Sequence, residues 1–347
     1  MIKVRKKLIE GSCVWSGKEM EKSDAWVIRW PDSAIDEIDA ALQVVKSKGL
    51  KLYEFGWRDF PVPWLASKIV SIQTELEDGR GFVLLSGFPV EKYSVADAEL
   101  IFWGLGSHFG SAVSQNWRGE LLSHVIDKGL EHGDKDVRGY QTRAKLFFHN
   151  DNGDAVGLFC VHEAKAGGAS KLVSTASVYN EILSRRPEYV DELCSGYYYH
   201  MRGEQPHGHR EVTEHRVPLF SYHDGRLSSR YTRNSILHGA KFLGQPLTER
   251  ETAPLDLVDE LCEELCLTMQ FNRGDMQLVS NHSVLHSRNE FEDFPEPDRK
   301  RDLLRLWVNL PNGRPLTHEF ATRYGPGSAR KGVPPKLPQE TFTPLGS

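Results

Sequence analysis

A histidine and an aspartate stand two residues apart at the end of a short apolar run: His149 and Asp151, in the segment LFFHND. In an extended strand, residues i and i+2 point to the same side, so the imidazole and the carboxylate would project together. They are two of the three ligands of a 2-His-1-carboxylate triad, which holds non-haem Fe(II) and leaves further positions open. The pair predicts a metal site if the chain supplies a third ligand.

Two histidines near the C-terminus, His282 and His286, are candidates for that ligand. On a strand both would point the same way, so their spacing does not choose between them. His286 follows an apolar pair and lies deeper in the predicted strand. We predict His286 as the ligand, with His282 behind the ligands or facing the substrate. A second His-x-Asp pattern, at His132 and Asp134, lies in a charged segment typical of a solvent loop, and we assign it no ligand.

Arg301 and Arg305 are four residues apart on the last apolar strand, so both would face one side. Charged side chains on the inward face of such a strand are costly unless they meet anions. Arginine suits this task because its planar group can grip a carboxylate with two hydrogen bonds. The pair predicts two bound carboxylates, one on a co-substrate and one on a substrate. The alternative is that one or both point outward as ordinary strand-edge charges.

Charge and composition argue against several classes of protein. The chain of 347 residues has a net charge of −5 and a pI near 6.3, which disfavours nucleic acid as a main partner. No apolar run approaches the roughly 20 residues of a membrane span, and the basic N-terminus lacks the apolar core of a signal peptide. The five cysteines are odd in number and form no CxxC motif, which favours free thiols in a reducing cytoplasm. We expect a cytoplasmic protein without membrane or nucleic-acid partners, and homo-oligomer formation stays open.

The first third of the chain is predicted to be largely helical. Its first long helix has Asp32 or Ser33 as N-cap and Gly49 as its end. The predicted elements are a strand at 25–30, helices at 32–49 and 63–77, a buried strand at 81–87, and a helix from the Ser94 cap to about residue 105.

From about residue 110 the pattern changes to short strands separated by turns, with helices only at 177–194, broken at Pro187, and at 255–267. The strand-like segments are 111–117, 121–127, 144–151, 156–164, 170–176, 195–203, 216–231, 276–288 and 302–310. This pattern predicts a mainly β fold with flanking helices (α+β) around a jelly-roll, cupin-like core. We expect a single domain over 1–347, with an N-terminal elaboration (1–80), a core (81–310) and a C-terminal extension (311–347).

The ordered combination HND, GGAS, NHSVLH and RDLLR resembles the taurine dioxygenase-like branch of Fe(II)/2-oxoglutarate-dependent oxygenases. This branch includes clavaminate synthase-like enzymes and carnitine-pathway hydroxylases. The resemblance spans about residues 81–310 and implies the double-stranded β-helix, in agreement with the predicted jelly roll. It also implies that His149, Asp151 and His286 are the iron ligands.

For the co-substrate, the resemblance implies Arg301 as the clamp on the distal carboxylate of 2-oxoglutarate, with Ser170 as a hydroxyl donor. Arg305 matches a position that often meets an anionic group of the substrate. The interval from His286 to Arg301 is on the long side for the family, which leaves the roles of the two arginines open to exchange. The presence of Asp151 argues against halogenation, because the family's halogenases lack this carboxylate.

The activity that the resemblance implies uses Fe(II), 2-oxoglutarate and O2 to oxidise an unactivated C–H bond of a small anionic substrate, a carboxylate or an amino acid. The outcome would be hydroxylation, or a related desaturation or cyclisation, with release of succinate and CO2. Two alternatives from other classes are a zinc-dependent hydrolase with the same two histidines and aspartate, and a non-catalytic jelly-roll binding protein.

Further polar residues near strand ends are weaker candidates to face the substrate, and each taken alone fits a structural role better: Gln115, Asn116, Tyr140, Thr142, Arg230 and Tyr231. The apolar residues Leu146, Phe147 and Phe148 would line a dry pocket wall. The histidine-rich segment that contains His207, His209 and His215 is either a lid or a solvated turn.

Overall fold

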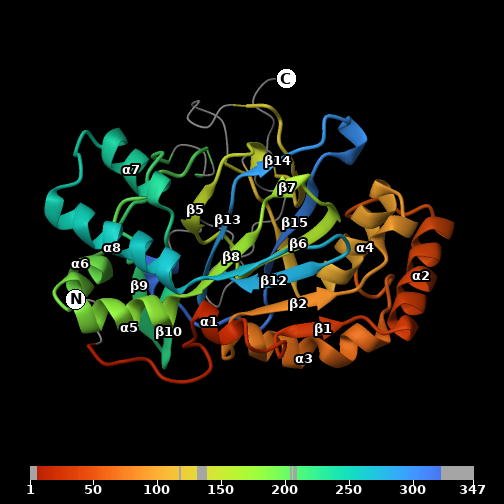
Figure 1. Cartoon of the computed structure of the whole chain (residues 1–347), viewed down its shortest axis with the longest axis horizontal. Helices are drawn as coiled ribbons and strands as arrows, with labels where there is room; N and C mark the ends of the chain where they lie inside the picture. The colour runs from red at the N-terminus through yellow and green to blue at the C-terminus, as the bar shows by residue number, and fades with distance from the viewer. Residues whose placement is uncertain (1–5, 117–118, 131–138, 204, 206–208, 322–347) are drawn as a thin grey trace.

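Two β-sheets form the centre of the structure, a computed structural model that describes residues 6–116, 119–130, 139–203, 205 and 209–321 (Figure 1). The larger sheet has seven strands. Their order is β1 (Val27–Arg29), β2 (Phe82–Ser86), β12 (Met276–Ser280), β6 (Ala155–His162), β15 (Asp302–Asn309) and β3 (Ser111–Val113), and β4 (Leu122–Val125) also pairs with β15. β1 and β2 are parallel, and the other pairs are antiparallel.

The smaller sheet has four antiparallel strands, in the order β11 (Leu267–Met269), β8 (Ser170–Ser174), β13 (Val284–Arg288) and β5 (Leu146–His149). From β5 onward the chain passes back and forth between the two sheets, so that strands distant in sequence become neighbours. This is the double-stranded β-helix, and the predicted fold class is confirmed. Two small antiparallel pairs accompany it, β9 (Phe220–His223) with β10 (Arg226–Ser229), and β7 (Ala166–Gly167) with β14 (Phe291–Glu292).

The inner faces of the two sheets share one hydrophobic cluster. Its members include Phe82 and Trp307 from the larger sheet and Leu172, Met269 and Val284 from the smaller one. Alternate residues of β15 contribute to opposite faces, as the period of a strand requires. The odd-numbered residues of β15 belong to the inner face, and the even-numbered leucines and valine pack outside.

Helices cover the outer face of each sheet. α2 (Asp32–Ser47), α3 (Pro63–Glu77) and α4 (Val95–Ser107) share a cluster with the outer face of the seven-stranded sheet. α5 (Thr175–Arg185), α6 (Tyr189–Ser195) and α8 (Glu249–Leu265) share another with the four-stranded sheet. Figure 1 shows α2 and α4 at the right, α3 below β1, and the second group at the left, with α7 (Arg233–Phe242) beside it. The short elements are α1 (Gly17–Met20), α9 (His318–Ala321) and 3₁₀ turns at Val90–Lys92, Gly139–Gln141 and Pro297–Arg299.

Several predicted elements need correction. The N-cap of α2 is Pro31, so neither Asp32 nor Ser33 has this role, and Asp32 lies in the first turn. α8 starts at Glu249 because Thr248 and Glu251 form a capping box ahead of the predicted start. The segment 195–203 is not a strand and makes only isolated bridges to residues further along the chain. β1, a strand of the predicted N-terminal elaboration (1–80), pairs with β2 and thereby adds a strand to the larger sheet.

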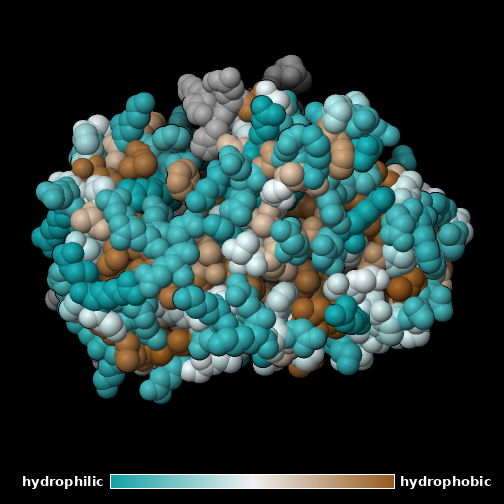
Figure 2. Space-filling view, in the orientation of Figure 1, coloured by the Kyte–Doolittle hydropathy of each residue, from teal (hydrophilic) through white to brown (hydrophobic). Residues whose placement is uncertain are grey.

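The face of the molecule seen in Figure 2 is mainly polar, and the cysteines form no disulfide bonds among the described residues. On this face, hydrophobic residues form small scattered groups. In the part of the chain that the structure describes, no helix is long and apolar enough to cross a membrane. All five cysteines are free, as expected.

Candidate active site

The three predicted metal ligands meet at one end of the space between the sheets. His149 ends β5 and is paired directly with His286 of β13, so the two imidazole rings lie 4.5 Å apart between centroids. Asp151 follows two residues after β5. Its carboxylate oxygens lie 3.9 Å from Nε2 of His149 and 3.5 Å from Nε2 of His286. One ligand atom from each residue lies within 4.8 Å of the other two, and among the described residues this group could hold a metal ion.

The backbone around Asp151 is fixed from several sides. Between the two ligands, Asn150 points the other way: its amide donates to Val284 O and accepts from the backbone N–H of Tyr231, both at 2.9 Å. The backbone N–H of Asp151 donates to Oδ1 of Asn281 at 3.2 Å, and the guanidinium of Arg230 donates to the Asp151 carbonyl. The alternation predicted from His-x-Asp therefore holds, with the middle residue anchoring the loop.

The electrostatics of the site suit a bound cation. Nδ1 of His149 donates to the carbonyl oxygen of Phe147 at 2.8 Å, which leaves Nε2 as the ligand atom. Burial, and then the neighbouring His286, lowers the pKa of His149 to about 4, so its imidazole is neutral at pH 7. Burial would raise the pKa of Asp151, but the Arg305 charge and the His286 ring outweigh it and hold this pKa below its usual range. A neutral imidazole and an ionised carboxylate are the forms that bind a metal ion.

Two side chains from β15 approach the carboxylate of Asp151. The indole Nε1 of Trp307 donates to Oδ2 at 2.9 Å, and Nη1 of Arg305 lies 3.7 Å from the same oxygen. Gln115 in turn holds Arg305, because its Oε1 accepts from Nε at 2.6 Å and its Nε2 donates to the Arg305 carbonyl at 2.7 Å. Trp307 was not among the predicted site residues. The sequence did offer one indication: Trp307 lies on the same strand face as the two predicted arginines.

A second buried group of charges contains Arg301 and lies beside Ser170, the two residues to which the resemblance assigns the co-substrate. Arg301 and Arg288 are each 5% exposed, and both guanidinium groups lie over the ring of Phe291, at 5.0 and 4.6 Å from its centroid. Nη1 of each has no hydrogen-bond partner among the described residues. Ser170 is the direct partner of Arg288 across β8 and β13, and its hydroxyl lies 3.4 Å from Oε1 of Gln277. Burial, and then Arg301, lowers the pKa of Arg288 to about 9. Two buried guanidinium groups with unused donors fit a bound anion.

Arg288 was missed by sequence reasoning, although it stands two residues after His286 and therefore shares its strand face. Its Nη2 also donates to the carbonyls of Thr142, at 2.8 Å, and Ala144. Arg288 thus ties the segment before β5 to β13.

Other predicted residues have structural partners instead of facing the site. His282 is fully buried, with Nε2 3.1 Å from Oδ1 of Asp154, so it has no surface for a substrate. Arg230 is also fully buried and holds the backbone of the Asp151 loop. Phe148 packs in the outer cluster with α5 and α8, which corrects its assignment to a pocket wall, whereas Phe147 is 55% exposed.

The remaining candidates are peripheral or not described. Asn116 bonds to Glu120, and the Tyr231 hydroxyl donates to Asp259 at 2.6 Å. Nδ1 of His209 lies 3.2 Å from Glu214, and the ring of His215 lies 6.1 Å from that of His318. The following lie outside the described residues: His132, Asp134, His207 and the side chain of Tyr140.

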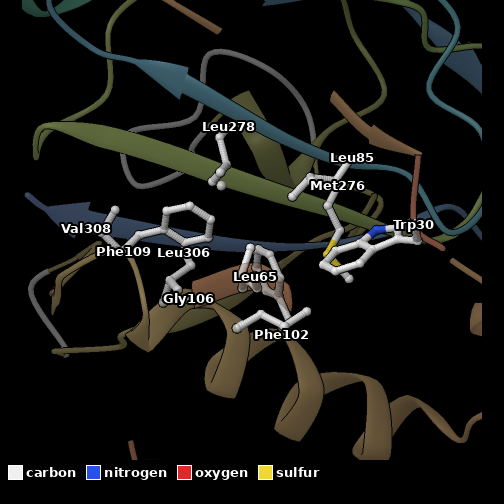
Figure 3. Close-up of a pocket in the computed structure, with 12 residues that line it drawn as sticks. Trp30, Leu65, Leu85, Phe102, Gly106, Phe109, Met276, Leu278, Leu306 and Val308 are labelled. Atoms are coloured by element: carbon white, nitrogen blue, oxygen red, sulfur yellow. The ribbon is translucent and has the colours of Figure 1, made fainter. Parts of the chain in front are cut away.

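An apolar gap in the structure is separate from this site. It lies between the outer face of the larger sheet and the helices α3 and α4 (Figure 3). Leu85, Met276 and Leu278 approach it from the sheet, and Leu65 and Phe102 approach it from the helices. No charged side chain lines the gap, so we regard it as a packing defect of the outer core.

Sequence comparisons relate the chain to known proteins. The model of the family "Taurine catabolism dioxygenase TauD, TfdA family" matches residues 46–307. The chain is 32% identical over 338 residues to FR-33289 synthase of Streptomyces rubellomurinus (strain ATCC 31215), covering 95% of this chain and 99% of that protein. It is 28% identical over 329 residues to the taurine hydroxylase-like protein SAT17 of Stachybotrys chartarum (strain CBS 109288 / IBT 7711), covering 91% and 82%.

Solved structures show the same fold. A complex of asparagine oxygenase with Fe(II), 2S,3S-3-hydroxyasparagine and succinate matches with a TM-score of 0.63 at 16% identity, covering 82% of this chain and 93% of that one. The non-heme iron oxygenase OrfP in complex with Fe and alpha-ketoglutaric acid matches with a TM-score of 0.57 at 13% identity, with the same coverage.

The fold and the family define an Fe(II)/2-oxoglutarate-dependent dioxygenase, with O2 as its other substrate. Within this class, the chain belongs to the TauD, TfdA family. The expected enzyme class and cofactors are thereby confirmed, and the hydrolase and binding-protein alternatives are set aside.

Proposed function

We propose that this enzyme hydroxylates a C–H bond of a small amino acid or related carboxylate, with His149, Asp151 and His286 as the iron ligands. The observation that carries the proposal is the meeting of three ligand atoms within 4.8 Å beside buried arginines with unused donors. When bound, iron together with 2-oxoglutarate and O2 supplies the oxidant for C–H cleavage, with succinate and CO2 as co-products.

The co-substrate end of the site is assigned to Arg301 and Ser170. A carboxylate at Arg301 would accept from Nη1, which has no partner among the described residues, and would offset the cost of burying the charge. Burial lowers the pKa of Arg301, and a bound anion would oppose this shift because it favours the charged form. Arg288 adds a second guanidinium beside the first, and Ser170 adds a hydroxyl donor.

The substrate end is assigned to Arg305. Its guanidinium lies 3.7 Å from Asp151 and is held by Gln115, so an anionic group of the substrate bound there would lie close to the metal ligands. The neighbours support an amino-acid substrate, because asparagine oxygenase was crystallised with hydroxyasparagine and OrfP with hydroxylated arginine. Gln115 is better described as positioning Arg305 than as contacting the substrate. Desaturation or cyclisation would use the same residues.

The test is a turnover assay with Fe(II), ascorbate, 2-oxoglutarate and a panel of L-amino acids and other small carboxylates. We expect O2 uptake and succinate release that rise with one member of the panel, and a hydroxylated product detected by mass spectrometry. Asp151→Ala should abolish both signals, whereas His223→Ala, at an exposed site at the end of β9, should leave them unchanged. The proposal fails if the wild type forms no succinate, or if Asp151→Ala retains full activity.

A further inference from the structure

The carboxylate of Asp151 lies beyond the end of β5, where no strand ladder holds it. Its closest polar contact among the described residues is the indole of Trp307, with Nε1 2.9 Å from Oδ2. The nearest nitrogens of His286 and Arg305 are farther from that oxygen, at 3.5 and 3.7 Å. The indole is therefore the group that restrains rotation of this side chain.

Trp307 is itself held rigidly. It is 4% exposed, lies within β15, and is paired with Val113 on one side and Val156 on the other. Its ring belongs to the cluster between the sheets, and the guanidinium carbon of Arg305 lies 4.9 Å from its centroid. An indole N–H is a donor only, so its natural partner is an acceptor such as an ionised carboxylate.

We infer that Trp307 is a positioning residue of the metal site, whose indole N–H sets the orientation in which Asp151 meets a metal ion. The inference rests on the proposed ligand set. A carboxylate can turn either oxygen, or both, toward a cation. A fixed donor limits this freedom, and partners that orient metal ligands are typically worth 10- to 100-fold in metal affinity or activity. The bond also joins a ligand next to the smaller sheet to a strand of the larger one.

Trp307→Phe tests the inference because it keeps an aromatic ring, although a smaller one, and removes the N–H donor. We expect the affinity for Mn(II), measured by EPR in the absence of 2-oxoglutarate, to fall about tenfold. The EPR spectrum of the bound Mn(II) should also change. The matched control is Trp103→Phe, which removes an indole hydrogen bond of the same length, to Phe55 O at 2.9 Å, in the outer core. The control should bind Mn(II) as the wild type does.

A second measurement does not require that Trp307→Phe folds. In wild-type protein with 15N-labelled indoles, Mn(II) should broaden one of the eight tryptophan N–H signals at the lowest metal occupancy. Asp151→Asn, which removes the charge of the acceptor, should shift that same signal in the metal-free protein. Unchanged affinity and spectrum in Trp307→Phe, or an early-broadened signal that Asp151→Asn does not shift, would overturn the inference. Failure of the wild type to bind Mn(II) would instead overturn the proposed ligand set.

Discussion

Arg301 illustrates the cost of a buried binding group in the metal-free protein. Its guanidinium is almost fully buried, and its Nη1 has no hydrogen-bond partner among the described residues. We predict that Arg301→Met, which retains a long side chain against Phe291, raises the free energy of unfolding of the ligand-free protein by about 1 kcal/mol. The same change should weaken 2-oxoglutarate binding at least tenfold. Chemical denaturation and calorimetric titration measure the two effects.

The control for this prediction is a buried arginine that has its partner. Nε of Arg314 lies 2.7 Å from Glu77 Oε2, and both side chains are almost fully buried. Arg314→Met should lower the free energy of unfolding by about 3 kcal/mol because it leaves a buried carboxylate unpaired. If both variants shift stability in the same direction, the unused charge at Arg301 is not the cause.

Residue types and spacing predicted which three side chains would meet better than they predicted the surroundings of those side chains. His149, Asp151 and His286 follow from two short motifs and the period of a strand. Trp307 shares a strand face with the two predicted arginines, but this spacing does not reveal its bond to Asp151, because the two residues are 156 positions apart and only the closed fold brings them together. Aromatic residues on inner strands are also common in hydrophobic cores. A tryptophan there therefore does not by itself indicate that its indole N–H bonds to a metal ligand.

At the level of elements, Asn150 connects the end of β5 to two other segments. Its side chain bonds to Val284 O in β13 and to the backbone N–H of Tyr231. Asn150→Ala would leave both buried groups without this partner, so we predict a loss of about 2 kcal/mol in the free energy of unfolding. Because Asn150 lies between two predicted ligands, the affinity for Mn(II) should also fall.

Asn180 offers a matched control for Asn150. Asn180 lies in α5, and its side chain bonds to the backbone N–H and carbonyl of Ile9, at 2.8 and 2.9 Å. Asn180→Ala should lower stability and leave Mn(II) affinity unchanged. Equal losses of Mn(II) affinity in the two variants would show that global stability, and not the β5 loop, controls metal binding.

His124 connects β4, β15 and α4, and its contacts lead us to predict that stability depends on pH. In β4, its Nδ1 lies 2.9 Å from both carboxylate oxygens of Asp302 in β15, and its Nε2 lies 3.0 Å from Glu99 in α4. The hydrogen bond to Asp302 is the largest cause of a raised pKa, which burial partly opposes. A raised folded-state pKa contributes stability below the unfolded value, about 6.5, and this stability is lost as pH rises through the folded value.

His124→Gln should therefore lower the melting temperature more at pH 6 than at pH 9. Glutamine can still donate a hydrogen bond but carries no charge, so the difference between the two pH values reports the imidazolium. Thermal unfolding of both proteins across this range measures it. A deficit that is the same at both pH values would mean that packing, and not charge, makes the contribution of His124.

Helices with a capping residue and a clear hydrophobic period were predicted well. Strands that need a partner far away in the sequence were predicted less well. α3 has the predicted bounds, and Ser94 caps α4 through the backbone N–H of Asp97, as its sequence indicated. Among the described residues, the strand-like segment 195–203 makes isolated bridges to Val217 and Val212 instead of a continuous ladder. α7 was missed because its glycine and polar residues obscure a helical pattern.

Across the whole molecule, Arg301 and the predicted metal ligands come from different segments, although Ser170 and Arg288 lie on the smaller sheet with those ligands. The predicted metal ligands lie on and beside the smaller sheet, whereas Arg301 immediately precedes β15 of the larger one. A ligand that binds only the folded protein raises the free energy of unfolding by about 2.7 kcal/mol at 100 times its dissociation constant. Metal and 2-oxoglutarate should therefore each stabilise the folded protein through different residues.

We therefore predict that two variants lose stabilisation by different ligands. Asp151→Ala should lose most of the stabilisation by Mn(II), because one predicted ligand is gone. Arg301→Met should keep the Mn(II) effect and lose the further stabilisation by 2-oxoglutarate, because its metal ligands are intact and its carboxylate clamp is not. Thermal unfolding with Mn(II) alone and with both ligands measures each contribution. Loss of the Mn(II) effect in Arg301→Met would show that the two ends of the site do not act separately, and would place Arg301 among the groups that maintain the metal site.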